Sequence, residues 1–201
     1  MAAIHAEPVW PLLLTSLAIM GSPGPATISL TAAGSAYGVR RSIGYMLGII
    51  AGTTAVLVAV ATGITATLLA LPGLRPVLIA ASAVYLIYLA YQIATAPPLA
   101  GEGPAARAPS LAGGTLLGVA NPKAWVAIAA VYASAHLASD PLADAAAKCA
   151  ALTGMIVLIS AGWLLIGASL APWLRQRRRA RIVNVALAVA LVAATVLAVV
   201  R

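Results

Sequence analysis

Six long apolar stretches constrain the fold of this chain more than any other feature of its sequence. They lie at residues 9–32, 43–70, 76–96, 111–137, 146–170 and 182–200. A membrane-spanning helix needs about 20 predominantly apolar residues, and these stretches are near or above that length. They lack the alternation of barrel strands and are too long for them. The sequence therefore predicts an all-α integral membrane protein with six transmembrane helices.

Composition supports the membrane assignment. Hydrophobic residues make up 63% of the 201 residues, and only 8% are charged, whereas a soluble domain averages about 25% charged residues. No Lys or Arg precedes Trp10, so we do not expect the first stretch to be a cleaved signal peptide. The single cysteine, Cys149, excludes an internal disulfide and dithiol chemistry.

The basic residues predict an orientation. With six spans, eight of them fall on one side of the membrane: Arg40, Arg41, Arg107 and the five arginines of "RQRRRAR" (175–181). Three fall on the other side: Arg75, Lys148 and Arg201. The positive-inside rule places the larger group in the cytoplasm and both termini outside. We interpret the arginine run as a topology signal that contacts anionic lipid, so we do not expect nucleic acid as a partner.

A linker rich in Pro and Gly divides the chain into two halves. Residues 97–110 separate a first three-helix unit, 1–96, from a second one, 111–201. Because three spans are an odd number, the second half enters the membrane in the opposite direction. We expect the two units to form one transmembrane domain.

The first helix of each half carries a helix breaker at the corresponding place. Aligning "GSPGPATISL" (21–30) with "GVANPKAWVA" (118–127) pairs Gly24 with Asn121 and Pro25 with Pro122. Proline lacks a backbone N–H, and its ring clashes with the preceding turn. We therefore predict two inverted repeats with broken first and fourth helices.

Paired interruptions in inverted repeats indicate the binding site of a secondary transporter. A helix broken within the membrane exposes unpaired N–H and C=O groups, and the new N-terminal end favours an anion. The alternative is a pair of simple proline kinks repaired by neighbouring helices. The predicted substrate-binding residues are Pro23, Gly24, Pro25, Ala26, Thr27, Thr53, Thr54, Asn121, Pro122 and Lys123.

Lys123 lies deep within the fourth stretch. An ionisable group at that depth is a functional candidate by default, and we expect it to bind a substrate carboxylate. The alternative is that its long side chain snorkels to the membrane interface.

Three glycines open the second stretch at four-residue spacing: Gly44, Gly48 and Gly52. This spacing places them on one helix face and allows a close helix–helix approach. We predict that they serve helix packing and gating.

Three motifs carry a resemblance to a known family. "GSPGPA" in the first stretch, "GVRRSIGYMLGIIAGT" leading into the second and "GVANPKAW" in the fourth resemble the LysE/RhtB family of bacterial amino-acid exporters. The resemblance implies ion-driven efflux of amino acids or similar small molecules across the cytoplasmic membrane, with H+ or Na+ as the coupling ion. The resemblance implies that the family's functional positions correspond to these residues: Pro23, Gly24, Pro25, Gly44, Gly48, Gly52, Asn121, Pro122 and Lys123.

The sequence departs from that family in one respect. Many members that export basic amino acids have an acidic residue early in the second span, where this chain has "GTTAVL", and none of the six stretches contains Asp or Glu. A neutral or weakly polar amino acid is therefore favoured as the substrate. We expect its carboxylate at Lys123 and its ammonium group on the unpaired carbonyls that precede each break.

Two other function classes use the same residues. An intramembrane hydrolase would take Ser22 or Ser29 as nucleophile and Lys123 as base. A membrane scaffold would have no cavity, and its Lys123 would reach the lipid headgroups. We expect no metal and no cofactor, since His5 and His136 lie on one predicted side and cannot sandwich a haem. Whether the chain forms a homo-oligomer is left open.

Overall fold

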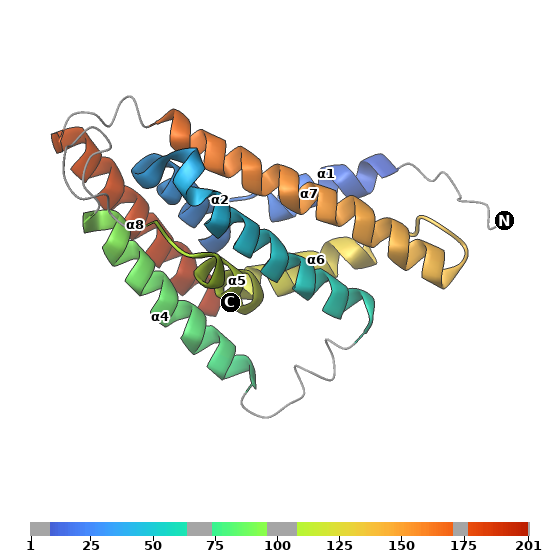
Figure 1. Ribbon diagram of the computed structural model, residues 1–201. Helices are drawn as coiled ribbons and strands as arrows, with labels where there is room; N and C mark the ends of the chain where they lie inside the picture. Colours follow the sequence, from blue (N-terminus) through green and yellow to red (C-terminus); the bar gives the residue numbers. More distant parts are fainter. Residues whose placement is uncertain (1–8, 64–73, 96–107, 171–176, 201) are drawn as a thin grey trace.

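The computed structural model describes residues 9–63, 74–95, 108–170 and 177–200 (Figure 1). All regular secondary structure in these ranges is helical, as predicted. The helices are α1 (Val9–Met20), α2 (Pro25–Ala61), α4 (Leu74–Thr95), α5 (Leu111–Ala120), α6 (Pro122–Ala133), α7 (Pro141–Ser169) and α8 (Arg177–Val200).

Within these ranges, the length and apolar character of the helices are those of a membrane protein. Helices α2 and α7 are each long and apolar enough to cross a membrane, and α5 and α6 together make a third candidate span, bent by 59°. The end of the second predicted stretch (64–70) and most of the linker (97–107) lie outside the described residues. The six-span inverted topology therefore stays a prediction.

Helix α2 is a hairpin rather than one straight rod. Its helical path is interrupted only at Gly38, whose φ of 75° and ψ of 167° are non-helical. The Tyr45 hydroxyl donates to Ser29 Oγ at 3.0 Å, although the two residues are 16 positions apart in the sequence. A straight helix would place them about 24 Å apart. The positive φ is one that glycine adopts readily. A single glycine thus joins the first two predicted stretches, where the sequence suggested a longer loop.

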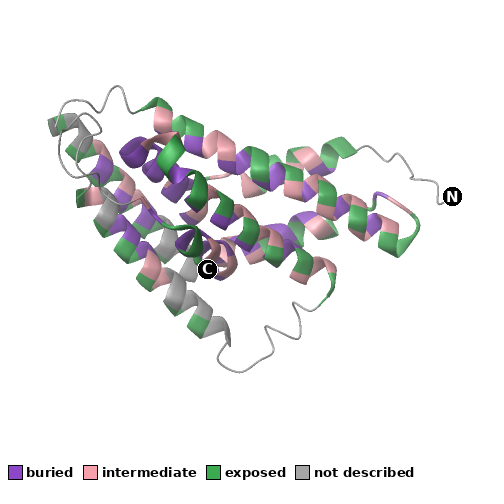
Figure 2. Ribbon diagram, viewed as in Figure 1, coloured by how far each residue is buried: buried purple, intermediate pink, exposed green. Residues whose placement is uncertain are grey.

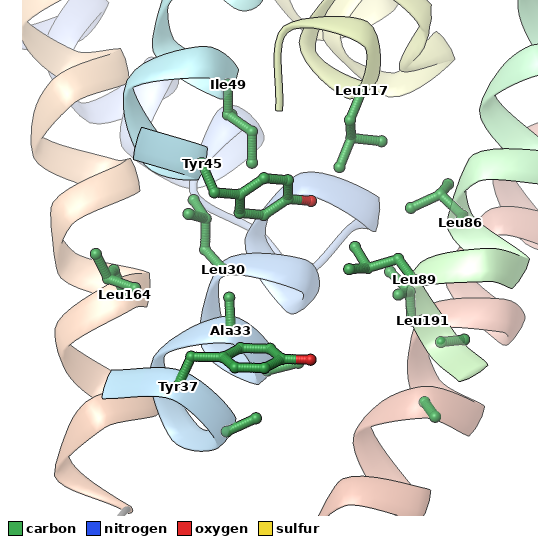
Figure 3. Close-up of a cluster of buried hydrophobic side chains, with 14 residues drawn as sticks. Leu30, Ala33, Tyr37, Tyr45, Ile49, Leu86, Leu89, Leu117, Leu164 and Leu191 are labelled. Atoms are coloured by element: carbon green, nitrogen blue, oxygen red, sulfur yellow. The ribbon is translucent and has the colours of Figure 1, made fainter. Parts of the chain in front are cut away.

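Two apolar clusters form the core of the described chain. The first surrounds the fully buried Tyr45, with Leu30, Ile49 and Leu117 close to its ring (Figure 3). The second joins α1, the C-terminal half of α2, α6 and the N-terminal half of α7, and it includes Leu12. Buried residues lie mainly between packed helices, and exposed ones on the outer faces (Figure 2). Exposed apolar side chains suit contact with lipid.

Glycines bring α2 and α5 into backbone contact. A Cβ atom added to Gly48 would collide with the carbonyl oxygen of Leu111, and one added to Gly118 would lie 2.8 Å from the carbonyl oxygen of Ile49. Gly52 would likewise meet α5. Gly44 differs, because an added Cβ would have nothing within 4 Å. Of the three predicted glycines, two make this close contact and Gly44 lies outside it.

A second glycine contact joins α2 to α7. A Cβ atom on Gly34 would lie 2.9 Å from the backbone nitrogen of Ala168, and one on Gly167 would meet the backbone of Thr31. The Thr31 hydroxyl also donates to the carbonyl of Trp163 at 3.3 Å. These contacts fix α7 beside the segment that follows the first helix break.

Helix α7 begins five residues before the predicted stretch because Asp140 caps it. The Asp140 carboxylate accepts a hydrogen bond from the Ala143 N–H at 2.8 Å, as N-cap side chains do. Asp144, one turn after Asp140, pairs at 2.8 Å with Lys148, which is only 2% exposed. Asp144 also accepts from the backbone N–H of Leu137, which ties the α6–α7 connection to α7.

The glycine contact generates a matched pair of variants. Gly48→Ala should destabilise the protein by about 1–3 kcal/mol, because the helices must separate to admit the methyl group. Gly44→Ala should leave stability unchanged or slightly raise it, since alanine favours helix and its Cβ meets nothing. Thermal unfolding of both variants in detergent measures the difference, and equal midpoints would contradict the backbone contact.

Candidate functional site

The first break lies between α1 and α2. Helix α1 ends at Met20 and α2 starts at Pro25, with Gly24 as its N-cap. The Gly24 N–H donates to Thr27 Oγ1 at 2.8 Å, and proline has no N–H to satisfy. Helix geometry gives the N–H groups of Ala26 and Thr27 no intrahelical partner. Both residues line a cavity at this break.

The second break lies between α5 and α6 and centres on Asn121. Its side-chain oxygen accepts from the Lys123 N–H at 3.2 Å, and its carbonyl accepts from the Ala124 N–H at 3.0 Å. Pro122 is the first residue of α6. The sequence alignment thus pairs residues that occupy the same position relative to a helix start, because Gly24 and Asn121 are both N-caps and each is followed by proline.

Tryptophans satisfy carbonyl groups on the other side of each break. Trp163 of α7 donates its indole N–H to the carbonyl of Gly21 at 3.0 Å. Trp125 of α6 donates to the carbonyl of Val119 at 2.7 Å. A helix leaves its last four carbonyls without intrahelical donors. The two indoles therefore stabilise breaks that would otherwise expose unpaired polar groups in an apolar setting.

Lys123 connects the two breaks directly. Its ammonium group donates to the carbonyl of Ser22, to Ser22 Oγ at 2.8 Å and to the carbonyl of Pro23 at 3.4 Å. A Cβ atom at Gly24 would lie 2.6 Å from Lys123 Cδ. The two breaks therefore lie close together, and Lys123 reaches the first break instead of extending away from it.

These contacts differ from the expected role of the carbonyls. We expected the carbonyls before each break to receive a substrate ammonium group. In the structure, three of these carbonyls already accept hydrogen bonds from side chains of the protein. Lys123 donates to the carbonyl of Ser22, Trp163 to that of Gly21 and Trp125 to that of Val119. The physical reason is that a carbonyl buried without a donor costs free energy even when no substrate is bound.

A cavity of about 60 Å³ lies at the junction of the breaks, with room for a few water molecules. Leu30 and Ile49 of its lining belong to the first apolar cluster, whereas Ile128 and Ile156 belong to the second. The cavity therefore lies between the two clusters. Among the described residues that line it, Lys123 is the only charged one.

The structure brings six of the ten predicted substrate-binding residues to this cavity: Gly24, Ala26, Thr27, Thr53, Asn121 and Lys123. Pro23, Pro25 and Pro122 belong to the breaks but do not line it. Thr54 does not line it either, and its buried hydroxyl has no hydrogen-bond partner among the described atoms. Consecutive residues on a helix point in different directions, so Thr53 and Thr54 cannot share one face.

Helix α7 supplies lining residues that sequence reasoning missed. Ile156, Ile159 and Ser160 lie on the cavity, and Ser160 adds a buried hydroxyl. A serine inside an apolar stretch was the available signal. The sequence alone does not show that Ser160 lines the cavity, because the packing of α7 against the first break depends on contacts such as that between Gly167 and Thr31.

Ser22 lies within hydrogen-bond distance of Lys123, but the donors point the wrong way for a nucleophile and base. The Ser22 hydroxyl donates to the carbonyl of Ile19 at 2.8 Å and accepts from the lysine ammonium. A general base would have to accept the serine proton. Ser29 donates to the carbonyl of Ala26 and accepts from Tyr45. Neither serine is arranged for the hydrolase chemistry considered above.

The indole contact at the first break predicts the effect of removing its donor. Trp163→Phe keeps an aromatic ring but removes the donor to Gly21, so we expect a loss of about 1–3 kcal/mol in stability from the unsatisfied carbonyl. Trp10→Phe is the control, because Trp10 is 70% exposed. Unfolding midpoints that fall equally for both variants would argue against the indole contact.

Comparison with known proteins identifies the family. The family model described as LysE type translocator matches residues 17–200. No curated protein and no solved structure gave a significant match. The match covers both breaks, Lys123 and every residue that lines the cavity.

Members of this family are membrane transporters of small molecules in the cytoplasmic membrane, not enzymes, which agrees with the donor geometry at Ser22. The resemblance seen in the motifs is thus confirmed over most of the chain. The chain belongs to the LysE type translocator family.

Proposed function

We propose that this transporter exports neutral or weakly polar amino acids from the cytoplasm through the cavity between the two breaks. The observation that carries the proposal is the position of Lys123, a single cation at the junction of two broken helices and on the cavity wall. Charged groups within membrane proteins face cavities and mark substrate paths. Binding at helix breaks is characteristic of secondary transporters.

The carboxylate of the substrate has a matching set of donors. Lys123 supplies a positive charge, and the N–H groups of Ala26 and Thr27 lie at the positive end of α2. The hydrogen bond of Lys123 to Pro23 is long at 3.4 Å. A carboxylate can replace that weak contact while the two bonds to Ser22 hold the ammonium group in place.

The substrate ammonium group would then bind hydroxyl oxygens. Thr53 and Ser160 contribute hydroxyls to the lining, from α2 and α7. A cationic side chain would have no carboxylate to pair with among the described lining residues. Placing such a charge in an apolar cavity without a partner is costly, which favours neutral side chains over lysine or arginine.

The two apolar clusters supply barriers for alternating access. One cluster borders the cavity on the side of Tyr45, and the other on the side of Leu12. Transport then requires each cluster to open in turn. The backbone contact of Gly48 and Gly118 lacks protruding side chains, so α2 and α5 can slide along it with little steric resistance.

Lys123→Met tests the role of the charge, because it keeps apolar bulk and removes the ammonium group. Cells loaded with dipeptides should lose most export of the corresponding amino acids, while the variant still inserts into the membrane. Lys123→Arg should restore export only in part, since the guanidinium is larger and planar. Ser169→Ala, an exposed hydroxyl at the end of the same α7 that lines the cavity, is the control and should export normally.

Normal export by Lys123→Met would place the binding site elsewhere. Robust export of lysine or arginine by the unaltered protein would show that the absence of a carboxylate is a wrong guide to the substrate. Both outcomes are read from the same panel of released amino acids.

The charge bias predicts that the termini face the periplasm. A reporter that fluoresces only in the cytoplasm, fused after Arg201, should stay dark, and one that is active only in the periplasm should give signal. The opposite pattern would contradict the orientation and would mean that one predicted segment does not span the membrane.

A further inference from the structure

We propose that Ser22 and Pro23 form a monovalent-cation site that the protein fills with its own lysine. The site consists of two carbonyl oxygens and the Ser22 hydroxyl, all of which accept from the Lys123 ammonium group. At this position the transporter then needs no Na+ or K+ from solution. This independence from solution cations does not depend on which substrate the transporter carries.

The oxygens belong to a helix end that attracts cations. They follow α1 directly, where the helix dipole is negative and the final carbonyls lack intrahelical donors. In transporters with broken helices, such ends and the unwound carbonyls beside them coordinate coupling cations. Here the same kind of end holds an ammonium group from the other half of the chain.

No carboxylate balances the charge of Lys123 within the described residues. The one buried carboxylate there, Asp144, is bound to Lys148. Lys123 is therefore held by carbonyl and hydroxyl dipoles, which is how a protein binds a bare monovalent cation. Lys148 shows the contrasting case of a lysine held in an ion pair.

Gly24 makes the space for the lysine side chain. A Cβ atom at position 24 would lie 2.6 Å from Lys123 Cδ and 3.1 Å from its ammonium nitrogen. The side chain therefore crosses the first break where no other side chain intervenes. Truncation of Lys123 should leave both the oxygens and a space beside them for a small cation.

Lys123→Ala tests the proposal on the purified full-length protein. Its unfolding midpoint is measured at constant ionic strength in the chlorides of choline, Na+, K+ and methylammonium, with choline as the cation too large for the space. We expect methylammonium, Na+ or K+ to raise the midpoint by about 2–4 °C above its value in choline. The unaltered protein should have the same midpoint in all four salts.

Lys123→Met is the matched control, because it also lacks the charge but fills the space with a side chain of similar length. Its midpoint should not respond to the small cations. Three results would overturn the proposal: no response of folded Lys123→Ala, an equal response of Lys123→Met, or a dependence of the unaltered protein on Na+ or K+.

Ser22→Ala provides a test that leaves the lysine in place. It removes one of the three oxygens, so we expect a lower midpoint with no response to added cations. A midpoint equal to that of the unaltered protein would contradict the site even if Lys123→Ala did not fold. Since every readout here is stability, a negative result would leave the export proposal to be judged by its own assay.

Discussion

Unpaired backbone groups at two helix breaks are the constraint on which the rest of this structure depends. Hydrocarbon offers no hydrogen bonds, so each exposed N–H or C=O must find a partner within the protein. Lys123, Trp163 and Trp125 supply donors to carbonyls, and Thr27 and Asn121 satisfy N–H groups. One of these side chains, Lys123, also brings the two breaks together.

This arrangement explains why the cavity lies where it does. Contacts between glycines and backbone hold α2 against α5 and α7, and Lys123 joins the second break to the first. The space left between the two apolar clusters is small and carries one cation. A carrier can use such a cavity between two apolar clusters, whereas a scaffold would have no use for it.

The sequence predicted the features that depend on local chemistry. Apolar length identified the helices, and the prolines at positions 25 and 122 marked where α2 and α6 begin. The Lys123–Ser22 contact and the contribution of Ser160 were not predictable, because they join residues about 100 or more positions apart through tertiary packing. Gly44 shows the limit of spacing arguments, since a shared helix face does not reveal where the neighbouring helix ends.

A double-mutant cycle tests most directly whether Lys123 joins the two breaks. The free energy of unfolding is measured for the unaltered protein, Ser22→Ala, Lys123→Met and the double variant. A direct charge-assisted contact predicts a coupling energy of about 1–3 kcal/mol, so the double variant should lose much less stability than the sum of the two single losses. Additivity within about 0.5 kcal/mol would contradict the contact, and with it the account of how the two halves meet.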